Sequence, residues 1–439
     1  MRSNDELSNV GGVALVGRVL DKIGFSSLFE SRRTADILKA HVALLCQGRA
    51  DFNDIEAFRG DGFFCEALGL KRVPSEATLR QRADGLSEAD LAAIRRAWRA
   101  ELDLAPLKPA RTAHGEYVPV DVDVSPFDNS GTKKEGVSRT YMGFDGYSPN
   151  FAYAGAEGVF LHCELREGSA HSQAGTPGFL RDCAEGMRGR AAPGQTLFRM
   201  DAGCDAYENL RVLREAGCHV LVKRNLRRES KEMWIERAKA LGDMEQPRPG
   251  KRVWTGSVAH VCPPPKDGGP EIPLFAVFRV VERTSDAKGQ AFLVPECEVH
   301  TWWTSLPDAP EEVVELYRQH AASEQHHSEF KSDLGVERLP SGKFATNAAV
   351  LMLAAVAYNV LRLIDQEALL HPEDMPVKAE ASRRRVGSVI RDLVFVAAKR
   401  VRHAGRVFLK FGRLCPWFKV FRAVYERFAP APDPAPASP

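Results

Sequence analysis

The spacing of apolar residues changes along the chain, and each change predicts a different kind of element. Up to about residue 110, apolar residues recur at the spacing of helices joined by short connections. The predicted helices cover residues 13–23, 37–47, 54–58 and 88–101. This pattern predicts an all-α region over residues 1–112.

One short helix in this region carries basic residues near its start. Ser75 follows Pro74 and can cap the N-terminus of the helix, and Arg80 and Arg82 lie early on it. Basic side chains near the N-terminus of a short helix fit the recognition helix of a helix-turn-helix, in which Arg80 and Arg82 would contact DNA. A solvated helix in an all-α domain is the alternative interpretation.

From residue 113 the apolar pattern becomes that of strands alternating with helices. Residues 117–124 alternate and are rich in valine, which predicts a strand. Further strands are expected at residues 160–165, 196–200 and 219–222, and helices at residues 178–187 and 207–216. Strands alternating with helices indicate an α/β layer structure over residues 113–222.

The pattern changes twice more before the C-terminus. Residues 223–303 are rich in Pro and Gly with β-prone pieces, which predicts a mostly β insertion. Residues 304–370 should contain a helix from about 310 to 334 and an apolar helix from 345 to 364. Because Asn359 and Arg362 interrupt this short apolar stretch, we expect a buried core helix rather than a membrane span. The Pro- and Ala-rich tail, residues 429–439, should be extended or disordered.

Composition narrows the class of protein. The 439 residues allow about three domains. Hydrophobic residues make up 44% and charged residues 27%, as in soluble globular proteins. The nine cysteines occur singly without a CxxC pair, which argues against a zinc ribbon or a thioredoxin-type site. Scattered thiols and a start without an apolar run indicate a cytoplasmic protein.

The charge of the chain is unevenly distributed. The whole chain has a formal charge of only +2, but residues 378–427 carry 14 Lys and Arg against three acidic residues, a balance of +11. Apolar residues separate these cations, which indicates a folded basic region over residues 371–428. Such a face is typical of proteins that bind phosphate backbones, and we expect DNA contacts from Arg383, Arg384 and Arg385. A solvated face is the alternative.

Three carboxylates occupy positions that suit metal-dependent chemistry. Asp123 lies near the end of the first predicted strand, Asp201 directly follows another, and Glu324 lies inside a helix. Magnesium prefers oxygen ligands, and two ions about 4 Å apart stabilise both the attacking and the leaving oxygen of an in-line displacement. The sequence therefore predicts catalytic, metal-binding roles for these three residues, with Mg²⁺ or Mn²⁺. Asp121 is the rival for the first position.

The helix around Glu324 contains further candidates. Tyr317, Glu324 and Lys331 are seven residues apart and should share a face, where Lys331 could hold a DNA phosphate. His320 and His327 flank Glu324, and an alternative hypothesis makes the three residues ligands of a transition metal. No second Glu-x-x-His helix is present to complete a bundle-type di-metal site.

Several motifs in order resemble one enzyme family. They are residues 54–61 and 74–82 before the core, 120–131 around Asp123, 198–203 around Asp201, 317–331 around Glu324, and 344–347 and 357–359 after it. Over residues 11–428 the chain resembles a DDE transposase of bacterial insertion sequences, most closely insertion-sequence family 1380.

The resemblance implies a ribonuclease H-like core with a β insertion between the second Asp and the Glu. It also implies cleavage at terminal inverted repeats, strand transfer into target DNA on divalent metal, and a homodimer on paired ends. Asp123, Asp201 and Glu324 match the catalytic triad, and Ser125 favours Asp123 over Asp121. Tyr317 and Lys331 match the Tyr–Arg–Glu–Lys signature. His320 replaces its arginine, and Arg318 lies nearby.

Two alternatives stay open from the sequence. One is a ribonuclease H-fold nuclease without strand transfer, and the other is a domesticated transposase that acts as a DNA-binding protein. Trp302 and Trp303, just before the helix of Glu324, could clamp an unstacked base, because such stacking is worth about 1–3 kcal/mol. Core packing is the competing interpretation of both tryptophans.

Overall fold

A ten-stranded mixed sheet forms the middle of the molecule. The computed structural model describes residues 5–227, 229–266, 268–377, 381–404 and 406–429, so nearly all of the predicted disordered tail lies outside the described residues. The strands lie in the order β11-β12-β13-β14-β10-β9-β3-β7-β8, and β2 pairs with β3. Their bounds are β2 (Ala110–Arg111), β3 (Glu116–Val124), β7 (Asn150–Ala154), β8 (Val159–Glu164), β9 (Thr196–Met200), β10 (His219–Lys223), β11 (Asp243–Arg248), β12 (Lys251–Cys262), β13 (Ile272–Ser285) and β14 (Ala291–Thr304).

Three neighbouring strands of the sheet, β3, β9 and β10, have their carboxyl ends at the same edge. β3, β9 and β10 are parallel neighbours, whereas β7 pairs antiparallel with β3, and β14 pairs antiparallel with β10. Because the carboxyl ends of parallel strands meet at one edge, residues that follow β3 and β9 come close together. These three strands are the ones that the sequence predicts at residues 117–124, 196–200 and 219–222.

Helices cover both faces of the sheet. Alternating residues of β3, such as Val120 and Val122, pack under α6 (Thr176–Met187) and α7 (Tyr207–Glu215). On the other face, Leu197 and Leu221 pack against α9 (Pro310–Arg318). The alternation of buried side chains along each strand thus produces a layered α/β arrangement.

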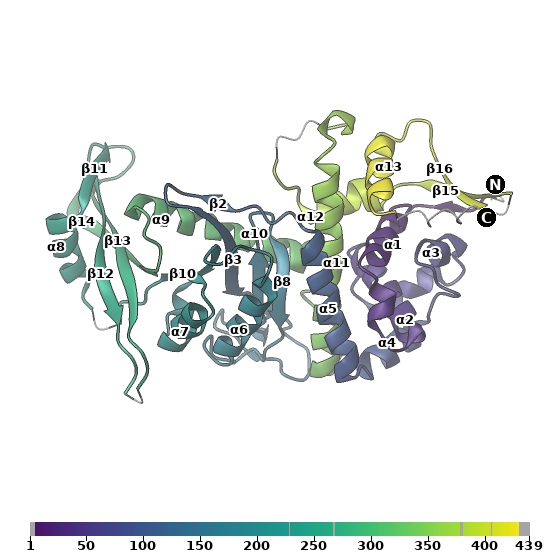
Figure 1. Ribbon diagram of the computed structural model, residues 1–439, viewed down its shortest axis with the longest axis horizontal. Coiled ribbons are helices and arrows are strands. Elements are labelled where there is room, and N and C mark those ends of the chain that lie inside the picture. The colour runs from purple at the N-terminus through teal and green to yellow at the C-terminus, as the bar shows by residue number, and fades with distance from the viewer. Residues whose placement is uncertain (1–4, 228, 267, 378–380, 405, 430–439) are drawn as a thin grey trace, which may run out of the picture.

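The long strands of residues 243–304 continue the main sheet rather than forming a separate one. Pairing of β14 with both β13 and β10 joins them to the parallel strands. Figure 1 shows β11–β14 and α8 (Lys231–Leu241) at one end of the elongated molecule, and the N-terminal helices at the other. The sheet therefore connects the β-rich segment to the region of Asp123 and Asp201.

The N-terminal helices surround α11 (Phe344–Ala368), and all belong to one hydrophobic cluster. Ser75 and Ser87 cap two of them by accepting backbone N–H bonds. The bounds are α1 (Val13–Lys22), η1 (Phe25–Leu28), α2 (Arg32–Leu45), η2 (Phe52–Phe58), α3 (Gly62–Ala67), α4 (Glu76–Asp84) and α5 (Glu88–Leu104).

Helix α11 is the element expected from the apolar stretch near residue 350. Within the described part of the chain, it is the one helix whose length and apolar composition would suffice to cross a membrane. Because 83% of its apolar window is buried inside the protein, α11 is a core helix, as the sequence predicts. Its partners include α5, α2 and the C-terminal α13 (Phe418–Arg427).

Short strands form two further sheets that the sequence patterns do not predict. β1 (Leu7–Ser8) pairs with β15 (Ala398–His403), which pairs with β16 (Arg406–Phe411). β4 (Phe127–Asp128), β6 (Asp145–Tyr147) and β5 (Ser138–Arg139) form the other. The remaining short helices are η3 (Ala202–Cys204), η6 (Pro372–Asp374), α12 (Val386–Val389) and η7 (Ile390–Val394).

Candidate active site

Three carboxylates predicted from the sequence line one cleft of about 550 Å³. Asp123 lies near the end of β3, and Asp201 directly follows β9, the parallel neighbour of β3. Glu324 comes from α10 (Ala322–Ser328), which contacts β3. The sheet and one helix thus bring together residues that are far apart in the sequence.

The surroundings of Asp123 and Asp201 disfavour two negative charges. Burial raises the pKa of Asp201, and the nearby Asp123 carboxylate raises it further. The Asp201 carboxylate accepts the Gly203 N–H at 2.9 Å, and Asp123 lies 3.4 Å from Nε2 of His327. A bound cation would relieve the repulsion between the two carboxylates.

Glu324 completes the set of oxygen donors. Its side chain is exposed, and it has no hydrogen bond or ion pair within the described residues. Oxygen donors of this kind suit a hard divalent cation. Among the described residues, however, no group of three or more His, Cys, Asp or Glu side chains lies close enough to hold a metal ion. The donor chemistry fits magnesium, whereas the three carboxylates are spread around the cleft.

Asp121, the rival of Asp123, is buried beneath the cleft. Its two carboxylate oxygens accept bonds from Nε and Nη2 of Arg199 at 2.7 and 2.6 Å. Nδ1 of His320 donates to it at 2.8 Å. Burial alone would raise the pKa of Asp121, but Arg199 and His320 lower it overall. The negative charge of Asp121 is therefore balanced by buried groups of the protein itself, Arg199 and His320.

The transition-metal hypothesis for His320, Glu324 and His327 is not supported by their positions. His320 directs Nδ1 to Asp121, and Nδ1 of His327 shares a hydrogen bond with the Tyr153 hydroxyl at 3.2 Å. These residues do not gather into a metal cluster within the described part of the chain. The histidines instead contact groups beneath and beside the carboxylates.

The helical segment that carries Glu324 is irregular. It runs through α9, a 3₁₀ turn η4 (Gln319–Ala321), α10 and a π-helical turn η5 (Glu329–Asp333). Tyr317 and Glu324 line the cleft, but Lys331 does not. Nζ of Lys331 donates to the Pro126 carbonyl oxygen at 2.6 Å, and burial lowers the pKa of Lys331. Because the turns change pitch, seven-residue spacing does not keep Lys331 on the cleft face.

Basic and aromatic side chains form the rest of the cleft wall. Arg318 and His320, both predicted, line it, and Arg318 is 3.2 Å from Glu315. Burial raises the pKa of Tyr317, and Asp201 and Asp123 raise it further. Further lining residues that the sequence analysis did not find are Tyr141, Lys223, Arg279 and His300.

Among the newly found cleft residues, Lys223 and Arg279 are the best candidates for binding a phosphate. Neither has an ion-pair or hydrogen-bond partner in the part of the chain that the structure describes. Lys223 ends β10, the next parallel strand after β9, so the strand-end argument used for Asp201 would have found it. Arg279 comes from β13 of the β-rich segment. The cleft therefore combines three acids with unpaired cations.

The two neighbouring tryptophans point to opposite faces of the sheet. Trp302 lines the cleft and packs against Tyr317, with ring centroids 5.6 Å apart. Trp303 is buried in the other hydrophobic cluster, where its Nε1 donates to Asp205 at 3.1 Å and the Arg224 guanidinium lies 3.9 Å from its ring. Since strand side chains alternate, the two rings lie on opposite faces of the sheet, and the contacts of Trp303 favour core packing over a base clamp for this residue.

Arg80 and Arg82 lie on α4 as predicted, and a basic groove lies near the start of this helix. Arg80 is exposed and pairs with Glu76 at 2.7 Å, whereas Arg82 is half-buried. The groove has a volume of about 480 Å³, and Ser75 and Thr78 contribute to its lining. Its basic lining residues are Arg32, Arg33, Arg59, Lys71 and Arg72.

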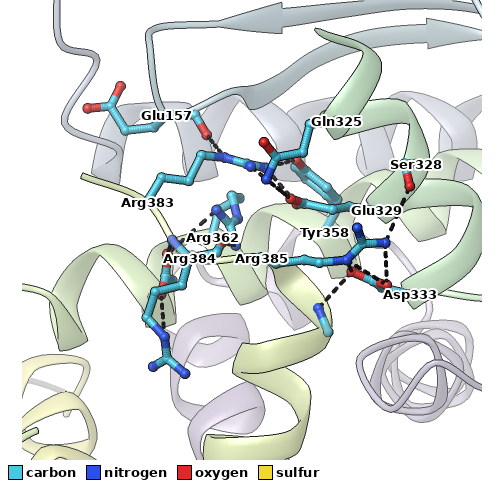
Figure 2. Close-up of polar contacts among 12 residues, drawn as sticks. Glu157, Gln325, Ser328, Glu329, Asp333, Tyr358, Arg362, Arg383, Arg384 and Arg385 are labelled. Carbon is cyan, nitrogen blue, oxygen red and sulfur yellow. Dashed lines mark hydrogen bonds and ion pairs between the residues drawn. The ribbon is translucent and has the colours of Figure 1, made fainter. Parts of the chain in front are cut away.

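Arg383, Arg384 and Arg385 face acidic residues of the protein itself, and Figure 2 shows this for Arg383 with Glu329 and Arg385 with Asp333. Arg383 makes two bonds to Glu329, at 2.8 and 2.6 Å, and Arg384 pairs with Asp392. Arg385 bonds to Asp333 at 2.9 Å. The side chains of Arg383 and Arg384 are 10% and 8% exposed, so these contacts argue against the expected phosphate contacts. The partners of Arg383 and Arg385 lie outside the basic segment, so they neutralise charges that the segment count left unpaired.

Two of three comparisons with known proteins relate nearly the whole chain to other proteins. No curated protein sequence matches this chain. A solved structure of the piggyBac transposase, a synaptic complex with hairpin DNA studied by cryo-EM, is similar over 96% of this chain and 80% of that chain, with 11% identity and a TM-score of 0.40. The sequence profile of the transposase DDE domain, group 1, matches residues 5–433. The chain therefore belongs to the family of DDE transposases defined by this domain.

Proposed function

We propose that this protein is a transposase of a bacterial insertion sequence, of the type of insertion-sequence family 1380. In this proposal it binds the terminal inverted repeats of the element, cleaves the DNA there and joins the ends to target DNA. The observation that carries the proposal is one cleft lined by Asp123, Asp201 and Glu324 together with Lys223 and Arg279, two cations without ion-pair partners among the described residues. Membership of the DDE family supports the same reaction class.

The sheet supports a ribonuclease H-like core. In the order β8-β7-β3-β9-β10, the first three strands are antiparallel, and the last two run parallel to β3. This mixture places the first two acids at the ends of adjacent strands. We assign residues 113–222 and 304–370 to this core, with the β-rich segment inserted between them.

Each group of cleft residues has a proposed task in the reaction. Asp123, Asp201 and Glu324 would hold two Mg²⁺ ions, for which Mn²⁺ should substitute. Such ions activate a bound water or hydroxyl and stabilise charge on the phosphate oxygens. Lys223, Arg279 and Arg318 would hold phosphates of the DNA backbone beside the carboxylates, because charge-assisted bonds to phosphate are strong. Tyr317 and Trp302 would shape the wall against which the strand lies.

DNA outside the cleft would contact the helical region. The groove beside α4 presents Arg33, Lys71 and Arg72 without ion-pair partners in the described part of the chain. Unpaired cations that converge on a groove fit a phosphate backbone. Arg80 and Arg82 would then contact the DNA next to this groove. We further propose action in the cytoplasm and a homodimer that pairs the two ends of the element.

The test uses the full chain and DNA that carries the sequence flanking its coding region. Wild-type protein with Mg²⁺ should nick this DNA at the ends of the element and join the ends to plasmid, whereas Asp123→Ala should bind the DNA but produce neither product. EDTA should stop both steps. Cleavage without joining would support a nuclease, and binding without cleavage by the wild type would support a DNA-binding protein; either result would overturn the proposal.

A further inference from the structure

We propose that Asp121, Arg199 and His320 form a buried positioning triad that aligns the three elements carrying the metal-binding carboxylates. This inference rests on the proposed function, because it assigns the triad a task in that same site. The triad would fix the distance between the strands and the helical segment, and so the affinity of the cleft for divalent metal.

Each residue of the triad precedes one of the three cleft carboxylates by a few positions in the same strand or helical segment. Asp121 precedes Asp123 by two residues on β3, and Arg199 precedes Asp201 by two residues at the end of β9. His320 precedes Glu324 by four residues in the helical segment. Side chains two apart on a strand point to the same side of the sheet, and His320 and Glu324 both line the cleft. The triad therefore forms a layer directly beneath the carboxylates.

The contacts of the triad join all three elements. Arg199 donates two bonds to Asp121, at 2.7 and 2.6 Å, and this links β9 to β3. Its remaining Nη1 donates to the Leu316 carbonyl oxygen of α9 at 2.8 Å. His320 donates to Asp121 at 2.8 Å, and this bond is the second link between the helical segment and the strands. One carboxylate and one guanidinium thus tie two strands and the helix together.

Burial makes the geometry of the triad specific. The side chains of Asp121 and Arg199 are each 3% exposed, and that of His320 is 9% exposed. The three donor nitrogens of Arg199 and both oxygens of Asp121 have partners. A fully satisfied polar network in a buried layer holds a single arrangement, because any shift leaves a buried charge unpaired.

The helical segment deviates from α-geometry where it meets the triad. The 3₁₀ turn Gln319–Ala321 is centred on His320, and α10 with Glu324 starts directly after it. A tighter turn at this point changes the direction in which the following residues project. We infer that the bond from His320 to Asp121 sets this turn and so directs Glu324 into the cleft.

The experiment measures Mn²⁺ binding to the full-length protein by electron paramagnetic resonance, without DNA, together with thermal unfolding. His320→Ala should weaken Mn²⁺ binding by about tenfold or more, as loss of groups that orient metal ligands commonly does. His320→Asn should restore most of the affinity, since its amide nitrogen can replace Nδ1. His41→Ala is the matched control, because His41 is also buried but belongs to α2 in the helical region. It should lower the melting temperature without changing Mn²⁺ affinity.

The outcomes separate this inference from the proposed function. Unchanged Mn²⁺ affinity in His320→Ala would reduce the triad to a stabilising role and overturn the inference, provided that Asp123→Ala has lost Mn²⁺ binding. If Asp123→Ala also binds Mn²⁺ like the wild type, the metal site itself is wrong, and both proposals fail. Should His320→Ala unfold, Arg199→Lys decides: it keeps the charge but loses the two-pronged geometry, so wild-type affinity in this variant would overturn the inference.

Discussion

Asp121 and Asp123 are two residues apart on one strand, yet their surroundings assign them different tasks. Asp121 is buried against Arg199 and His320, whereas the side chain of Asp123 is 27% exposed in the cleft. The sequence places both on the same side of β3, and only the resemblance to a family motif favoured Asp123. Position along the strand decides which carboxylate reaches the cleft.

Substitution by asparagine should separate the two carboxylates. Asp121→Asn leaves the Arg199 guanidinium buried without its counter-charge, so the free energy of unfolding should fall by about 3–5 kcal/mol. Asp123→Asn removes one of two repelling carboxylates and should leave stability unchanged or slightly higher, while DNA cleavage is lost. Denaturant unfolding and a cleavage assay check both effects. A stable, cleaving Asp123→Asn variant would contradict the assignment.

Glu101 carries a buried carboxylate in the helical region, outside the cleft. It lies fully buried on α5, where the Asn359 side chain interacts with its carboxylate. Burial raises its pKa well above the ordinary value of 4.5. Above that pH the unfolded chain releases a proton that the folded chain retains, so this residue makes the fold less stable as the pH rises.

Glu101→Gln should therefore gain stability relative to the wild type as the pH rises from 5 to 8. The relative gain should reach up to about 1.4 kcal/mol per pH unit, the value for one proton. Unfolding in denaturant at several pH values measures it, with the exposed Glu88→Gln on the same helix as control. If the difference between Glu101→Gln and the wild type does not change with pH, the carboxylate is not protonated in the folded protein.

Regular elements could be predicted from the sequence, but their interruptions could not. Periodicity identified β3, β9, β10 and α11 because their burial follows simple alternation or a continuous apolar run. The helix predicted from about 310 to 334 contains a 3₁₀ and a π-helical turn, which follow tertiary contacts of His320 and Lys331. Strands of two or three residues, such as β1 and β4, are too short to produce a pattern.

The alternation of β14 predicts different effects for its two tryptophans. Trp303→Ala should lower the free energy of unfolding by about 3–5 kcal/mol, since the ring is buried and bonded to Asp205. At a temperature at which it is still folded, this variant should cleave DNA at nearly the wild-type rate. Trp302→Ala should lower both stability and cleavage, because its ring lines the cleft. Loss of cleavage by folded Trp303→Ala would contradict this account.

The charge of a segment did not predict the charge of the folded surface. Cations of the basic C-terminal region pair with acids from other parts of the chain: Arg383 with Glu329, Arg400 with Glu6 and Glu66, and Arg427 with Glu367. Such long-range pairing cannot be found from residue counts. In contrast, Arg33, Lys71 and Arg72, which no motif singled out, meet in a groove with no partner in the described residues.

Salt dependence of DNA binding should therefore depend on the groove rather than on the arginine run. Each phosphate contact contributes about 0.9 to the slope of log affinity against log salt, so Lys71→Ala with Arg72→Ala should flatten the slope by up to about two units. Arg385→Ala, which breaks the bonds to Asp333, should change the slope little and lower the melting temperature instead. Fluorescence anisotropy at several salt concentrations distinguishes the two, and the opposite pattern would place the DNA on the C-terminal region.

Asp123, Asp201 and Glu324 should act together in one cleft to break DNA, and Glu324→Gln tests this joint action most directly. Glu324 is exposed and has no partner within the described residues, so its substitution should alter neither melting temperature nor DNA affinity. The single-turnover rate of end cleavage in Mg²⁺ should fall at least about a thousandfold, equivalent to about 4 kcal/mol of transition-state stabilisation. A Glu324→Gln protein that cleaves at the wild-type rate would contradict the account.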